Sequence, residues 1–143
     1  MKKYRLILLL LLTGSIIILW RTLMPVKIIG VHKLGRTSAV VIVKNFPLTR
    51  NGSLVWWKQH KNQIEEKWNF LKSPKIHRIF FFQTDYKKNH GTDEDSDLLC
   101  FNDMNSEQNC IPKEHRPLVV RYYPDGSVEY ETQYFFDPFL RRL

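Results

Sequence analysis

Residues 26–46 read VKIIGVHKLGRTSAVVIVKNF, and this stretch decides the fold of everything that follows the first 25 residues. It contains two runs rich in β-branched residues, Val26–Leu34 and Ser38–Phe46, separated by a Gly-Arg pair. Two such runs with a short glycine-containing break are typical of an antiparallel hairpin. Pro47 has no backbone N–H for a strand ladder, so it predicts the end of the hairpin.

A helix is expected directly after the hairpin. Residues 53–69 read SLVWWKQHKNQIEEKWN, and Thr49 or Ser53 can cap this segment. Apolar side chains recur along one face at helical spacing, and polar side chains cover the rest. The apolar positions are Leu54, Trp57, Ile64 and Trp68. This pattern predicts a helix that packs against a sheet.

The remainder of the chain predicts further strands and loops. The predicted strands are residues 76–84, 98–101, 118–123 and 127–134. Pro124-Asp125-Gly126 is a strong turn signal between the last two. The tail, residues 135–143, reads FFDPFLRRL and either packs on the core or stays exposed as a contact segment. Because strands and helices do not alternate regularly, we expect an α+β fold with an antiparallel or mixed sheet and one packed helix.

Upstream of the hairpin, residues 1–25 read MKKYRLILLLLLTGSIIILWRTLMP. A positive head precedes 15 residues without a charge, of which eleven are Leu or Ile. Their summed insertion free energy is roughly −3 to −7 kcal/mol, which favours a transmembrane helix. The predicted anchor positions are Leu6, Leu12, Ile16 and Trp20. We therefore expect a membrane anchor in residues 1–25 and a single domain in residues 26–143.

A cleaved signal peptide is the competing interpretation of the same segment, because it also has a charged head and a short apolar stretch. Cleavage needs small residues just after the apolar stretch, and this chain has LWRTLMP there. We therefore expect an uncleaved signal-anchor in a bacterial inner membrane. Basic residues flank both ends, so the positive-inside rule alone does not decide the orientation. The short head favours a cytoplasmic N-terminus and a periplasmic domain.

Cys100 and Cys110 supply a second argument for export. They stand in LLCFNDMNSEQNCIP with nine residues between them. An even pair after an export-like start predicts a disulfide that closes a small loop. The alternative is two reduced cysteines that pack as small apolar groups in a cytoplasmic domain. The spacing fits neither a zinc site nor a CxxC redox pair.

Charge is unevenly distributed along the chain, whose formal net charge is +8. Residues 22–92 hold 13 basic and 3 acidic side chains, whereas residues 93–143 hold 5 basic and 11 acidic side chains. This asymmetry suits a domain that meets an anionic surface, unless the two halves mix their charges in the fold. No basic helix stripe or RNA-binding aromatic signature occurs, so we expect no nucleic-acid partner.

The sequence offers little for catalysis. It contains no nucleophile elbow, P-loop, dinucleotide motif or paired histidine ligands. The acidic run at residues 93–97 resembles part of a calcium loop but has leucine at the sixth position and methionine at the twelfth. Asp103 and Glu107 lie between the cysteines, and an acid role there would need a pocket. We expect no catalytic residue, metal or cofactor.

Trp56 and Trp57 are the candidate contact for a partner. Tryptophan is enriched at binding hot spots because one rigid ring covers a large area. The alternative is that both rings hold the helix against the sheet.

Several stretches together resemble a known family. The short anchor, VKNFPLT at residues 43–49, the WW pair and the LCFNDMNSEQNC segment are similar to a family of small enterobacterial inner-membrane proteins of unknown function. The resemblance covers about residues 1–123. It implies a membrane location and an enterobacterial host, and it implies no activity, cofactor or site residue.

Two functions remain open from the sequence. The first is a periplasmic protein-binding accessory, or a factor that neutralises an incoming toxin in the manner of an immunity protein. The second is a module that binds lipid or an envelope polymer at the inner-membrane surface through the basic half. An envelope hydrolase is a third, less favoured interpretation.

Overall fold

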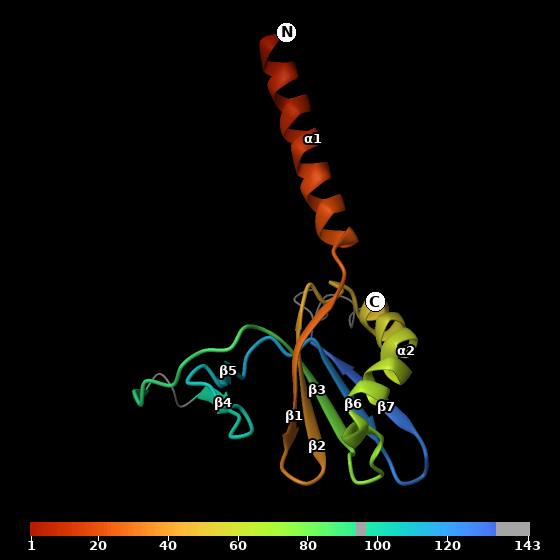
Figure 1. Cartoon of the computed structure of the whole chain (residues 1–143). Coiled ribbons are helices and arrows are strands. Elements are labelled where there is room, and N and C mark those ends of the chain that lie inside the picture. The colour runs from red at the N-terminus through yellow and green to blue at the C-terminus, as the bar shows by residue number, and fades with distance from the viewer. Residues whose placement is uncertain (94–96, 134–143) are drawn as a thin grey trace.

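The structure is a computed structural model that describes residues 1–93 and 97–133 (Figure 1). Helix α1 (Lys2–Leu23) projects away from the rest of the molecule, and none of its residues is buried. Its 22 residues extend about 33 Å, close to the ~30 Å hydrocarbon core of a bilayer. By length and composition, α1 can cross a membrane.

The polar side chains inside α1 bond within the helix. The Thr13 hydroxyl donates to the Leu10 carbonyl at 3.0 Å, and the Ser15 hydroxyl donates to the Leu11 carbonyl at 2.8 Å. Such bonds leave no unpaired hydroxyl hydrogen towards lipid. The predicted anchor positions all present exposed side chains: Leu6, Leu12, Ile16 and Trp20.

The domain is built on a five-stranded sheet in the order β1-β2-β3-β6-β7. Its strands are β1 (Lys27–Leu34), β2 (Ser38–Lys44), β3 (Arg78–Gln83), β6 (Leu118–Tyr122) and β7 (Val128–Thr132). β2 and β3 are parallel, and every other neighbouring pair is antiparallel. The sheet is therefore mixed, and the predicted hairpin and the predicted turn before β7 are both confirmed.

Helix α2 (Arg50–Lys67) and the short 3-10 helix η1 (Asn69–Lys72) connect β2 to β3. Parallel neighbours require such a crossover. The Thr49 hydroxyl accepts a hydrogen bond from the Gly52 N–H at 3.1 Å and caps α2, as predicted. Trp57 and Ile64 are buried between α2 and one face of the sheet. The predicted α+β fold with one packed helix is confirmed.

Strand β2 lies inside the core because both faces of the sheet are covered. Ala39 to Val43 are completely buried, alternating between the α2 face and the opposite face. A strand that is covered on both faces is apolar at every position, unlike a strand with one face exposed to solvent.

A second, two-stranded sheet forms the cover of the opposite face. β4 (Leu98–Cys100) and β5 (Cys110–Pro112) pair antiparallel, and we call residues 98–112 the disulfide flap. Phe101 and Ile111 of the flap pack on Val40, Ile42 and Phe82 of the main sheet. Figure 1 shows the flap on the side of the sheet away from α2. The sequence analysis missed β5, and the tail at residues 135–143 lies outside the described residues.

Candidate functional site

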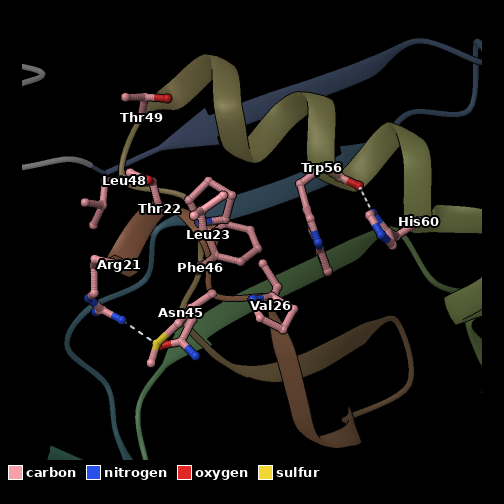
Figure 2. A pocket seen from close by; sticks show the side chains of 13 residues that line it. Arg21, Thr22, Leu23, Val26, Asn45, Phe46, Leu48, Thr49, Trp56 and His60 are labelled. Carbon is pink, nitrogen blue, oxygen red and sulfur yellow. Dashed lines mark hydrogen bonds between the residues drawn. The ribbon is translucent and has the colours of Figure 1, made fainter. Parts of the chain in front are cut away.

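A pocket of about 530 Å³ lies where α1 meets the domain (Figure 2). We call it the anchor–domain pocket. Its lining residues are Arg21, Thr22, Leu23, Met24, Pro25, Val26, Asn45, Phe46, Pro47, Leu48, Thr49, Trp56 and His60. This volume falls within the range of sites for small molecules. The site therefore combines the last turn of the apolar helix with the β2–α2 connection.

The short link between α1 and β1 creates this arrangement. Only three residues separate the end of α1 from the start of β1, and one of them is Pro25. An Arg21 guanidinium nitrogen donates a hydrogen bond to Asn45 Oδ1 at 2.6 Å. Asn45 has a φ of 56°, a left-handed conformation that asparagine tolerates better than most residues. This turn brings Asn45 close to the end of α1.

Trp56 forms one wall of the pocket. Its ring meets Phe46 edge to face at 5.2 Å between centroids and stacks on His60 at 4.9 Å. His60 Nδ1 lies 2.8 Å from the Trp56 carbonyl oxygen, so Nδ1 carries the proton that is donated. Figure 2 shows Arg21 and Asn45 at one end of the pocket, Trp56 and His60 at the other, and Phe46 between them. The wall is apolar with a polar group at each end.

The described residues that line the pocket carry a net positive charge. Arg21 is the permanent cation of its lining, and none of the lining residues carries a carboxylate. The nearby Lys44 is engaged, because its amino group lies 2.6 Å from Asp85. A ligand with a negative group is therefore matched better than a ligand with a positive group.

The two predicted contact tryptophans have different surroundings. Trp57 is 1% exposed and meets Phe81 edge to face at 5.3 Å, so its ring holds α2 to the sheet. Trp56 is only half-buried and lines the pocket. Trp56 is therefore the member of the pair that a ligand can reach.

The two cysteines form a disulfide in the flap. Cys100 and Cys110 are directly opposite each other on β4 and β5. Cys110 is completely buried, and Cys100 faces the surface. The predicted pairing is therefore present in the structure.

A buried polar cluster, which the sequence analysis missed, ties the flap to the main sheet. His32 on β1 places Nδ1 2.8 Å from an Asp103 carboxylate oxygen, and its ring stacks on Phe101. Nε2 lies 2.5 Å from the Tyr86 hydroxyl. Burial, followed by the charge of Asp103, raises the pKa of Tyr86, so the phenol stays protonated and donates to Nε2. The three side chains bond to one another across β1, the flap and the segment after β3, and we interpret the cluster as a structural tie.

Gly30 is the sequence feature that could have pointed to this cluster, because a glycine within a strand often marks a close approach by another group. A side-chain carbon at Gly30 would overlap the Tyr86 hydroxyl. We expect Gly30→Ala to lower the free energy of unfolding by about 1–3 kcal/mol, because Tyr86 must withdraw and leave buried His32 without its donor.

Chemical denaturation of Gly30→Ala, Tyr86→Phe and the double variant measures this effect. The cost of Gly30→Ala should fall markedly in the Tyr86→Phe background, where the overlapping hydroxyl is gone. An equal cost in both backgrounds would show that Tyr86 is not the cause.

Other predicted groups do not assemble into a site. Among residues 1–93 and 97–133, no cluster of three or more His, Cys, Asp or Glu side chains could hold a metal ion. The acidic run at residues 93–97 is described only at its two ends, because residues 94–96 lie outside the described residues. Glu107 lies on the flap surface and pairs with Lys88 at 2.6 Å.

Comparison with known proteins identifies the family. The family model "Enterobacterial putative membrane protein (DUF943)" matches residues 1–135. The chain belongs to this family. The match confirms the resemblance carried by the anchor, the WW pair and the cysteine segment, and it agrees with the membrane span offered by α1. No curated protein and no solved structure matches the chain.

The description of DUF943 names the enterobacteria and a membrane association, and it gives no activity. The chemistry of this DUF943 protein must therefore be argued from its own residues. Of the groups described above, the anchor–domain pocket is the one that is lined both by the candidate membrane helix and by the domain.

Proposed function

We propose that this DUF943 protein is a single-pass inner-membrane protein whose periplasmic domain binds a membrane lipid in the anchor–domain pocket. The observation that carries the proposal is the shared wall of that pocket. Leu23 and Met24 come from the end of the apolar helix, and Phe46 and Trp56 come from the domain. A molecule in the pocket would therefore lie at the membrane surface, where phospholipid is the most abundant small amphiphile.

The periplasmic side is supported by the disulfide and by the short basic head. Disulfides persist in the oxidising periplasm and are rare in the cytoplasm. The paired Cys100 and Cys110 therefore suit an exported domain. Export of the domain leaves the head, with Lys2 and Lys3, in the cytoplasm.

Binding without catalysis is supported by the groups that line the pocket. General acid–base chemistry needs a proton donor and acceptor within reach of one substrate. In the described lining, the two ionisable side chains are Arg21 and His60, which lie at opposite ends. Arginine keeps its proton, so it cannot serve as a base.

Co-purification tests the proposal. The full-length protein, extracted in mild detergent and examined by native mass spectrometry, is expected to retain about one phospholipid per chain. Trp56→Ala should lose most of this lipid, because it removes the largest apolar surface of the pocket wall. Tyr123→Ala, an exposed aromatic residue beyond the end of β6, should retain it. Wild-type protein free of lipid, or equal lipid in both variants, would contradict the proposal.

A protein partner is the second candidate, as an envelope accessory or a toxin-neutralising factor. Its support is the exposure of Leu48 and Val55, two apolar side chains near the start of α2. A photo-crosslinker at position 55 should then give a discrete protein adduct in intact cells, whereas one at position 128 should not. Identical patterns at both positions would remove this candidate.

A further inference from the structure

We infer that the anchor–domain pocket selects phospholipids with a net negative headgroup, and that Arg21 recognises their phosphate. This inference rests on the proposed lipid-binding function and adds the chemical class of the ligand. Three features of the molecule support it: the depth of Arg21 at the membrane, the donors that its guanidinium leaves free, and the charges around the pocket.

Arg21 has a defined depth in a membrane that α1 spans. It lies two residues before the end of α1, whose length is close to the thickness of the hydrocarbon core. Lys2 and Lys3 begin the same helix. A helix that spans the core with charges near both ends places those charges in the two headgroup layers. The guanidinium of Arg21 would therefore lie at the level of the lipid phosphates.

Arg21 keeps N–H donors beyond the one that bonds to Asn45. A guanidinium carries five N–H donors in a rigid fork, and Asn45 Oδ1 accepts from one nitrogen. The Arg21 side chain is exposed, so the remaining edge of the fork is open to solvent. Asn45 thus holds the group in place while leaving donors for a phosphate, which arginine can bind through two parallel bonds.

Further basic side chains lie beside the pocket in the sequence. Arg50 follows the lining residue Thr49, Lys27 follows the lining residue Val26, and both side chains are exposed. The first turn of α2 contains no acidic residue. The described lining also contains no carboxylate. The surroundings of the pocket are therefore positive.

Zwitterionic and anionic headgroups differ in the chemical groups that they bring to Arg21. A zwitterionic phosphatidylethanolamine brings an ammonium group. This positive group would be repelled by Arg21 and its basic neighbours, and the described lining contains no carboxylate that could pair with it. An anionic phosphatidylglycerol brings hydroxyl groups instead, and the Asn45 side-chain amide can bond to hydroxyls. The phosphate interaction is common to both lipids, so selectivity arises from the rest of the headgroup.

A competition experiment tests the inference. Full-length protein is equilibrated in mixed micelles with equal amounts of phosphatidylglycerol and phosphatidylethanolamine, and the bound lipids are counted by native mass spectrometry. Wild-type protein is expected to enrich phosphatidylglycerol about fivefold, the factor that one basic side chain contributes near an anionic surface. Arg21→Gln should lose most of this enrichment, with only the part due to Arg50 and Lys27 remaining, and Arg21→Lys should fall between.

Arg36→Gln is the matched control. Arg36 is an exposed arginine in the β1–β2 turn, at the end of the domain away from α1 (Figure 1), so its loss changes the net charge equally. It should leave the fivefold enrichment unchanged. Equal binding of both lipids by wild-type protein would overturn the inference while leaving lipid binding intact, and so would an equal loss in Arg36→Gln. Wild-type protein that binds neither lipid would instead refute the proposed function itself.

Discussion

Replacing Trp57 with alanine is expected to lower the free energy of unfolding by about 3–5 kcal/mol, the usual cost of truncating a buried tryptophan. Trp57 is 1% exposed and packs edge to face on Phe81 of β3. Its removal would leave a cavity between α2 and the sheet, where Ile64 also packs. Neighbouring side chains are held by the β2–α2–β3 connection, so the cavity can collapse only in part.

Denaturant titration of the full-length protein in detergent, followed by circular dichroism, measures this loss. Trp56→Ala is the matched control, because the same atoms are removed from the next position of the same helix. Trp56 is only half-buried and should cost clearly less. If the two variants lose the same stability, the division of the pair into one core residue and one pocket residue is incorrect.

The second large effect is expected from the disulfide. Replacing both Cys100 and Cys110 with alanine should lower the free energy of unfolding by about 2–3 kcal/mol, because the bond no longer restricts a loop of about 11 residues in the unfolded chain. The loss should be concentrated in the disulfide flap. The strands β4 and β5 contribute only three residues each, so a short ladder joins them to each other without the bond, while Phe101 and Ile111 still pack on the main sheet.

Hydrogen exchange by mass spectrometry tests where this loss occurs. Peptides from residues 98–112 should exchange faster in the double variant, whereas β2 and β3 should keep their protection. Wild-type protein treated with a reductant should reproduce the pattern. Uniform acceleration over the whole domain would show that the flap is part of the main folding unit.

Much of the fold follows from local sequence patterns. The β-branched runs, the Pro-Asp-Gly turn and the helical spacing of Trp57 and Ile64 each specify an element without reference to the rest of the chain. The parallel pairing of β2 with β3 is less local. It depends on the direction in which α2 returns the chain, so both an antiparallel and a mixed sheet were consistent with the sequence. Strand β5 was missed because three residues are too few for a pattern.

The candidate site depends on contacts that sequence spacing does not reveal. His32 and Asp103 are far apart in the chain, and their hydrogen bond exists only because the flap folds over the sheet. The anchor–domain pocket needs Arg21 and Asn45 to meet, which follows from the short link and from the turn at Asn45. Trp56 and Trp57 look alike in the sequence, and only the packing of α2 separates their roles.

Thiol labelling of spheroplasts tests the central claim, that an uncleaved α1 spans the inner membrane and carries an oxidised domain on the periplasmic side. The cells are treated with a membrane-impermeant maleimide–polymer, before and after an impermeant phosphine reductant. We expect no shift before reduction and, after it, an adduct on Cys100, which faces the surface, with the unlabelled band at the mass of the full-length chain. Labelling of Cys100 without reductant, and only after the inner membrane is dissolved, would place the domain in the cytoplasm and contradict the account.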